Sequence, residues 1–355
     1  MYDRGTNPDS VDRTFRLSRR SGLRLTGLGA LLSVLGSNAA AAQDASPVAS
    51  PDASCISDPA ANSATAARWF TEVLNQKRFD ILAEIMDPNV GLDPGAFSGM
   101  TGVAQVEQML SELLGAFPDA SYTIEETLVD EDRVVIRWTG TGMHAVDYAG
   151  APATGETKQW SGIHFFQFEC GLISGIWAEA DLLVQLGLVE QGQATPAAAT
   201  GASGSPAAEC AAPTKDEMEG FAQAWHDVWT SQDLTALEEV VHADAVHHAG
   251  LWQDATGLPG IQSNLSTFFS AFPDLQGTLE DVVVDGDRVA IRYSATGTND
   301  GSFFGAPPTG ESVSMSGMAI LRVACGEIVE VWSEVSGIPL WQQLGLLERE
   351  ATPAA

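Results

Sequence analysis

Asp181 and His144 are the candidates for acid–base chemistry in this chain of 355 residues. Asp181 follows Trp177 by four positions, and an aspartate beside an indole in a partly dry cavity would have its pKa raised by desolvation. Such a carboxyl group suits proton transfer near neutral pH. His144 could hydrogen-bond a substrate carbonyl or enolate and stabilise its negative charge. Each residue also has a simpler interpretation, because Asp181 could cap a helix over residues 182–188 and His144 could be a solvated loop residue.

The strand after Thr154-Gly155 carries further candidates. Alternation predicts one shared face, either lining a pocket or packing under helices, for Trp160, Gly162, His164 and Phe166. The aromatic and polar character of this set makes the first half of the chain the better ligand site. The residues expected to line a pocket across the chain are Trp138, Trp160, His164, Trp177, Glu179, His247, His248, Trp332 and Glu334.

Two glutamates of that set repeat the same local pattern. Glu179 and Glu334 each follow a tryptophan, Trp177 or Trp332, by two positions and so share its face. They are either buried polar residues of a pocket or solvated residues at a sheet edge.

His247 and His248 are neighbours on an extended segment, so their side chains point in opposite directions and only one can face a pocket. A metal site would need His and carboxylate ligands at defined spacing, which this segment lacks. The chain also lacks a Ser-His-Asp set, a phosphate-binding Gly-rich loop and a dinucleotide motif. We therefore expect neither a metal nor a cofactor.

The charge balance restricts the partners. The chain has 17 Lys and Arg against 47 Asp and Glu, a net charge of −30. A nucleic-acid-binding protein needs cations to neutralise phosphates, so nucleic acid is excluded as a partner, and anionic membrane surfaces are disfavoured. The few strand arginines, such as Arg137 and Arg292, are expected to pair with carboxylates.

A tandem repeat organises the elements that must position these residues. A shift of 155 residues aligns the two halves, for example Ala-Phe-Pro-Asp at 116–119 with 271–274 and Trp177 with Trp332. A period this long indicates duplicated domains rather than a solenoid. The shift also aligns the four cysteines in two pairs.

Each repeat has the same predicted layout of helices followed by antiparallel strands. Helices are expected over 61–75 and 79–86, and over 218–231 and 234–241, with a third helix capped by Thr101 or Thr256. Asp-Gly at 285–286 and Cys-Gly at 170–171 and 325–326 predict hairpin turns. This order is typical of an α+β fold, with helices packed on one face of a curved sheet.

The N-terminus has the features of a bacterial export signal. Arg19-Arg20 precedes a moderately apolar run at 25–36, and four alanines at 39–42 suit cleavage. The pair suggests twin-arginine export, although Sec export and an uncut membrane anchor are alternatives. The predicted organisation is export signal 1–42, linker 43–60, domain 61–189, linker 190–214, domain 215–348 and tail 349–355.

The cysteines fit an oxidising compartment outside the cytoplasm. Four cysteines allow three pairings. The simplest assumes that each repeat was complete before duplication, and it gives Cys55–Cys170 and Cys210–Cys325. Metal binding is the weaker interpretation, because no CxxC motif or neighbouring His cluster accompanies them.

The repeats share an ordered set of motifs: Phe-Pro-Asp, Gly-Asp-Arg-Val-Ala-Ile-Arg at 286–292, Gly-x-Pro-x-Thr-Gly, Cys-Gly-Glu-Ile-Val-Glu-Val-Trp at 325–332 and a closing Gln-Leu-Gly. With these motifs both repeats resemble the SnoaL-like polyketide cyclases, also called ester cyclases, over residues 61–189 and 215–348. The resemblance implies the cone-shaped nuclear-transport-factor-2-like fold over a pocket. It also implies cofactor-free aldol chemistry on polyketide esters, with an Asp moving the proton.

The resemblance carries over unevenly to the two repeats. The family's Asp, four residues after the last-strand tryptophan, matches Asp181, whereas repeat two has Ser336. The His of the Gly-Thr-His-x-Gly loop matches His144, whereas repeat two has Asn299. The His pair after the second helix matches 247–248, whereas residues 92–93 of repeat one are Leu-Asp.

Three functions follow from this distribution. The first is an enzyme that transfers protons on a hydrophobic carbonyl or polyketide-type molecule, with Asp181 and His144 in repeat one. The second is a binding protein whose catalytic sets are eroded, and the third is an envelope interaction protein that uses the cones as a scaffold. The first two functions take a small hydrophobic molecule as partner, and the two domains are expected to pack as an intramolecular pseudo-dimer.

Overall fold

The computed structural model describes residues 58–93, 99–187 and 210–345. The predicted export signal, Cys55, the tail and most of both linkers lie outside these residues. All described residues belong to one compact unit, 54–355. Within the described part of the chain, no helix has the length and apolar character needed to cross a membrane.

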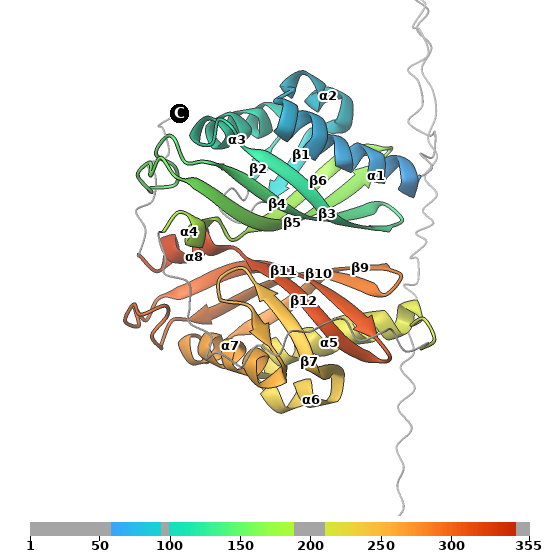
Figure 1. The fold of residues 1–355 in the computed structure, drawn as a ribbon, viewed down its shortest axis with the longest axis vertical. Coiled ribbons are helices and arrows are strands. Elements are labelled where there is room, and N and C mark those ends of the chain that lie inside the picture. The colour runs from blue at the N-terminus through green and yellow to red at the C-terminus, as the bar shows by residue number, and fades with distance from the viewer. Residues whose placement is uncertain (1–57, 94–98, 188–209, 346–355) are drawn as a thin grey trace, which may run out of the picture. The chain divides into compact units, whose positions relative to one another are not determined.

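In repeat one, the helices between residues 59 and 116 pack on one face of a six-stranded sheet, and the short helix at 182–185 lies on the side towards repeat two (Figure 1). Its helical segments are α1 (Pro59–Arg68), η1 (Trp69–Leu74), η2 (Phe79–Ile81), α2 (Leu82–Ile85), α3 (Val103–Ala116) and α4 (Leu182–Gln185). Its strands are β1 (Met86–Asp93), β2 (Met100–Thr101), β3 (Ser121–Asp130), β4 (Arg133–Met143), β5 (Thr157–Glu169) and β6 (Leu172–Ala180). The strand order is β2-β1-β6-β5-β4-β3, with β1 parallel to β6 and the other pairs antiparallel.

Repeat two has the same architecture. Its helical segments are α5 (Lys215–Ser231), η4 (Leu234–Ala236), α6 (Leu237–Val240), α7 (Leu258–Ala271) and α8 (Gly337–Gln343). Its strands are β7 (Val241–Ala249), β8 (Ala255–Thr256), β9 (Gln276–Asp285), β10 (Arg288–Thr298), β11 (Ser312–Ala324) and β12 (Glu327–Val335). The strand order β8-β7-β12-β11-β10-β9 reproduces that of repeat one and confirms the predicted α+β tandem.

The helix starts follow local capping chemistry. Thr214 and Glu217 form a reciprocal capping box, so α5 begins three residues earlier than predicted. The prediction of Thr101 and Thr256 as N-caps was wrong. The caps are Gly102 and Gly257, at φ 86° and 78°, because the chain must turn sharply from a short edge strand into the helix.

The hairpins form where the sequence predicts them. Cys325 and Gly326 both have positive φ, 53° and 81°, and connect β11 to β12. Cys325 is bonded to Cys210, which ties the segment before α5 to the tip of this hairpin, as expected. Cys170 at the matching turn is also disulfide-bonded, and its predicted partner lies outside the described residues.

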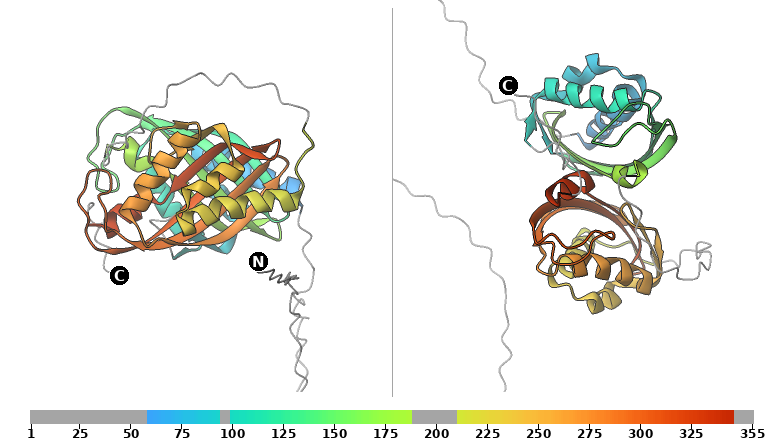
Figure 2. Two further views of the ribbon diagram at one scale, coloured as in Figure 1. Left: turned by 90° about the horizontal axis from the view of Figure 1, so that it is seen from below. Right: turned by 90° about the vertical axis from the view of Figure 1, so that its left-hand side faces the viewer.

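Alternation along the strands gives each sheet two different faces. The inner face packs on the helices along the concave side of the sheet (Figure 2). The outer faces of the two sheets share an apolar cluster, formed by Leu128, Val135, Ile163 and Phe165 of repeat one with Val283, Ala290, Met318 and Ile320 of repeat two. Residues on the outer faces can therefore be buried even though they lie outside both cones.

Candidate functional site

The cone of repeat one encloses a cavity of about 150 Å³. Its wall is mainly aromatic and aliphatic, and three residues of repeat two complete it. The lining residues are Trp69, Leu74, Met109, Leu110, Leu113, Tyr122, Trp138, Tyr148, Trp160, His164, Ala178, Glu179, Ala180, Leu182, Ser336, Gly337 and Pro339. This size and composition suit a small, largely apolar molecule.

His164 is the polar centre of the inner wall. Strand alternation places it on the same face of β5 as Trp160, and both are buried. The indole nitrogen of Trp138 donates a hydrogen bond to Nδ1 of His164 at 2.7 Å. Burial lowers the pKa of His164 to about 3, so the ring is neutral. Because Nδ1 accepts, Nε2 carries the proton and is the donor that this ring offers to a ligand.

Glu179 lines the same cavity but turns towards repeat two. Its Oε1 accepts a hydrogen bond from the Ser316 hydroxyl at 2.5 Å. The side chain is buried, so the edge-residue interpretation was wrong for it. Trp177, two residues earlier, lies on the same outer face, where Arg292 stacks over its ring at 4.4 Å. Trp177 lines neither the cone cavity nor the cavity between the repeats.

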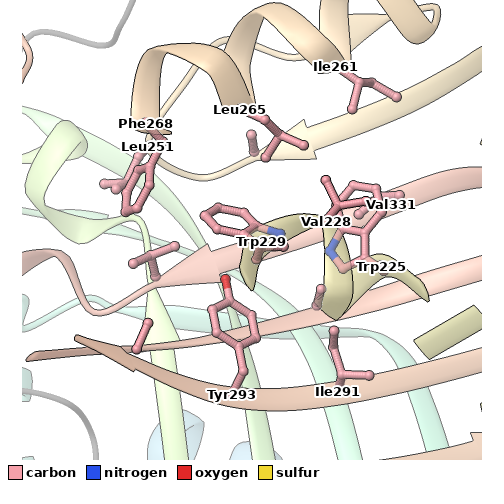
Figure 3. Packing of buried hydrophobic residues seen from close by; sticks show 14 of the residues in the cluster. Trp225, Val228, Trp229, Leu251, Ile261, Leu265, Phe268, Ile291, Tyr293 and Val331 are labelled. Atoms are coloured by element: carbon pink, nitrogen blue, oxygen red, sulfur yellow. The ribbon is translucent and has the colours of Figure 1, made fainter. Parts of the chain in front are cut away.

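The cone of repeat two is filled by side chains, and its remaining cavity is only about 10 Å³. Trp229 of α5 spans from α7 to the sheet, with ring centroids 5.2 Å from Phe268 and 5.8 Å from Tyr293 (Figure 3). The residues aligned with Trp229 and Phe268 in repeat one are Leu74 and Leu113. Leucines at these positions leave open the space that the two larger rings occupy.

A separate cavity of about 110 Å³ lies between the two sheets. Its lining includes charged residues from both repeats. The lining residues are Arg137, Ser161, Ile163, Asp181, His248, Ala249, Gly250, Asp254, Trp332 and Glu334.

Asp181 faces this interface cavity, whereas its neighbours Ala180 and Leu182 line the cone. The Ser161 N–H donates to Asp181 Oδ1 at 2.7 Å, and the Gln185 amide donates to Oδ2 at 3.2 Å. Burial raises the pKa of Asp181 from 3.8 to about 6, against the lowering effect of these bonds. Asp181 also precedes α4, so the helix-start position and the raised pKa occur together.

Glu334 approaches Asp181 from the other repeat. Its Oε1 accepts a hydrogen bond from the Ser161 hydroxyl at 2.7 Å, so Ser161 contacts both carboxyl groups. Burial raises the pKa of Glu334 well above its ordinary value, and the nearby Asp181 and Glu179 raise it further. Glu334 is thus a buried acid, not the solvated edge residue of the alternative interpretation.

His144 lines neither of these cavities. It is fully buried and stacks on Phe117 with ring centroids 5.2 Å apart, so it is not a solvated loop residue. Neither ring nitrogen has a hydrogen-bond partner among the described residues. At the matching position, Asn299 Oδ1 accepts from the Thr309 N–H at 2.9 Å, which holds the loop together. The structure does not bring His144 and Asp181 into one cavity.

His247 and His248 do point in opposite directions. His247 is buried against Trp225, its Nε2 lies 2.6 Å from the Ser333 hydroxyl, and it lines neither of the two cavities. Burial lowers its pKa to about 4. His248 stacks on Trp332 in the interface cavity. Burial lowers the pKa of His248, but bonds to Asp254 and Glu330 outweigh this and raise it overall.

Several lining residues of the cone were not identified from the sequence. Met109, Leu110 and Leu113 come from α3, and Tyr122 and Tyr148 come from β3 and a loop. The helical spacing of the α3 residues marks an apolar stripe, but such a stripe looks the same whether it borders a cavity or a filled core. Among the described residues, no group of three or more His, Cys, Asp or Glu side chains is arranged to hold a metal ion.

Comparison with known proteins supports one family. The model described as SnoaL-like polyketide cyclase matches residues 64–187 and again 220–344, more than half of the chain. No curated protein matches the sequence.

Three solved structures illustrate the similarity. AclR from Streptomyces galilaeus is 28% identical, with 39% of this chain and 91% of that chain covered and a TM-score of 0.37. IdmH from Streptomyces antibioticus is 32% identical, with 36% and 97% covered and a TM-score of 0.32. A SnoaL-like polyketide cyclase from Agrobacterium tumefaciens is 26% identical, with 36% and 98% covered and a TM-score of 0.32.

Proposed function

Because the chain belongs to the SnoaL-like polyketide cyclase family, we propose that repeat one binds a small, largely apolar carbonyl compound in its cone. The observation that carries the proposal is the cavity of about 150 Å³ in repeat one, where the matching cone of repeat two retains only about 10 Å³. Repeat two is then a structural partner without a ligand of its own in the cone. Its residues Ser336, Gly337 and Pro339 supply part of the wall.

The polar group of the ligand is a hydrogen-bond acceptor. His164 is held neutral by burial, and the Trp138 bond to Nδ1 leaves the Nε2 proton for a ligand oxygen. A carbonyl or enolate oxygen would accept this bond, whereas a hydrocarbon would leave the buried donor unpaired. We expect a ketone to bind about two- to tenfold more tightly than its parent hydrocarbon, since a net hydrogen bond contributes roughly 0.5–1.5 kcal/mol.

A ligand panel tests this function. The oxidised chain is titrated with polycyclic aromatic ketones, esters and fatty acids, with thermal unfolding and tryptophan fluorescence as readouts. Leu113→Phe introduces the ring that repeat two carries at the aligned position, Phe268, and should abolish binding. Phe268→Leu is the matched control and should retain it. Binding that survives Leu113→Phe, or that needs Phe268, would refute a site in the cone of repeat one.

A second candidate is cofactor-free acid–base catalysis by Asp181 on a compound held in the interface cavity that its carboxyl group faces, without His144, which lines neither cavity. The raised pKa of Asp181, about 6, favours this function because the carboxyl group can exchange a proton near neutral pH. Asp181→Asn should then abolish turnover of any compound found in the panel and leave the fold intact. Full turnover in this variant would leave ligand binding as the function.

We also propose that the protein is exported and that its two repeats pack as a pseudo-dimer. The Cys210–Cys325 bond supports export, because disulfides persist in oxidising compartments. The shared apolar cluster and the reciprocal serine–glutamate bonds support the packing. N-terminal sequencing of secreted protein should give a start after residue 42, and a start before residue 30 would contradict cleavage of an export signal.

Small-angle scattering should give a single compact particle. A profile typical of two separated domains would contradict the packing of the repeats as a pseudo-dimer.

A further inference from the structure

The cavity between the sheets contains an acidic group that the proposed function does not use. Glu334 is 6% exposed, and its Oε2 has no hydrogen-bond partner among the described residues. That oxygen is directed at Gly250, another wall residue, because a Cβ built on Gly250 would lie 1.9 Å from it. A buried carboxyl oxygen without a donor is costly, so its presence in a cavity points to a missing partner.

The acidic residues of this cavity are less compensated than the basic ones. Among the described residues, Asp181 and Glu334 receive hydrogen bonds only from neutral groups, which are the Ser161 backbone and hydroxyl and the Gln185 amide. The two basic residues already face carboxylates, Arg137 at Glu126 and His248 at Asp254 and Glu330. The carboxyl groups that lack a basic partner therefore favour a positively charged ligand over an anion.

We propose that this interface cavity binds a small organic cation with a primary ammonium group. An ammonium has three N–H donors and no acceptor, which fits Glu334 Oε2 and the neighbouring Asp181 carboxylate. The cavity of about 110 Å³ has room for several non-hydrogen atoms. A metal ion is the weaker occupant, because the described residues contain no group of three or more suitable ligands. The two repeats would then form this site together, independently of the cone.

Three probes of similar length test the sign of the ligand's charge. The oxidised full chain is titrated by calorimetry with n-butylammonium, n-butanol and butyrate at constant ionic strength. Saturable binding of butylammonium, about tenfold or more tighter than butanol, is expected from a charge-assisted hydrogen bond. Equal binding of butanol, preferred binding of butyrate, or no saturable binding in the millimolar range would overturn the proposal.

Variants locate the site. Glu334→Gln should weaken butylammonium binding about tenfold or more, because the amide keeps the shape but cannot ionise to pair with the bound ammonium. Gly250→Ala should weaken it similarly by displacing the Glu334 carboxylate. Glu280→Gln is the control, an exposed glutamate of repeat two that lines neither cavity, and it should change binding less than about twofold. Unchanged binding in both Glu334→Gln and Gly250→Ala would overturn the site. Leu113→Phe distinguishes the interface site from the cone site, because this variant should block the cone ligand and leave butylammonium binding unchanged.

Discussion

The two cones of this protein have the same strand order and different interiors. Repeat one holds a cavity of about 150 Å³, and repeat two holds about 10 Å³. The sheet-side residues do not explain this, because Trp160 and Tyr122 of repeat one align with the smaller Met315 and Gly277. The difference comes from elsewhere in the wall. Repeat two has Trp229 and Phe268 on its helices, and it adds further rings.

The added rings show how a cone can be filled without changing the strand order of its sheet. Trp341 of α8 stacks on Phe303 with centroids 5.4 Å apart, and Trp252 lies 5.7 Å from Phe268. Together with Trp229 they form one continuous aromatic core. Repeat two therefore fills with side chains the space that repeat one leaves as a cavity.

Truncation of the aligned pair Trp229 and Leu74 gives the largest expected effect on this comparison. Trp229→Ala should lower the free energy of unfolding by about 3–5 kcal/mol, because it removes a large ring from a filled core. Leu74→Ala should cost only about 2 kcal/mol, because Leu74 already borders a cavity and loses fewer contacts. Urea unfolding of both variants measures the difference.

Equal losses in the two variants would contradict the contrast between an open and a filled cone. Trp229→Ala should also create an apolar cavity that binds an indole-sized molecule, detectable by fluorescence titration. Leu74→Ala serves as its control, since it enlarges a site that is already present.

Much of the fold was predictable from the sequence, because it depends on local signals. The shift of 155 residues, the Asp-Gly turn and the Cys-Gly turns fixed the repeats and hairpins, and the structure agrees. Strand alternation also placed Glu179 with Trp177. It could not show that their face meets repeat two, because sheet-to-sheet packing is a long-range property.

The site was only partly predictable for the same reason. The cone wall does include Trp138, Trp160, His164 and Glu179 among the predicted lining residues. The cavity that the Asp181 side chain faces depends on which face of the sheet packs against repeat two. The residues next to Asp181 in the sequence do not reveal this. The aligned repeats show Leu74 in repeat one where repeat two has Trp229. The effect of this difference on the size of the cavity follows only once both side chains are known to point into the cone.

The acidic residue at position 181 provides a second contrast, with an expected effect of intermediate size. Burial raises the pKa of Asp181 from 3.8 to about 6, so the folded chain holds a proton there that the unfolded chain has lost between these pH values. The resulting stabilisation is complete below about pH 4 and is lost as the pH rises to about 6, by roughly 3 kcal/mol. Unfolding free energies of wild type and Asp181→Asn across pH 4–7 measure this, and the variant should lack this component.

The matched change is made in repeat two. The Ser336 hydroxyl accepts the Ser316 N–H at 2.9 Å, as Asp181 accepts that of Ser161. Ser336→Asp should therefore add a second loss of stability over the same pH range. If the difference in unfolding free energy between Asp181→Asn and wild type does not change with pH, position 181 does not distinguish the repeats in this way.

The smallest expected effect concerns the feature that the repeats share. Arg137 lies 4.6 Å from the centroid of Trp332, and Arg292 lies 4.4 Å from that of Trp177, so each repeat gives one cation to a ring of the other. Double-mutant cycles with Arg→Met and Trp→Leu should give coupling energies of about 0.5–1 kcal/mol for both pairs. Similar values are expected because the outer faces kept their pairing while the cones diverged. Coupling in one pair alone would show that the two repeats also differ at their interface. The inner faces of the sheets would then not have changed independently of the outer faces.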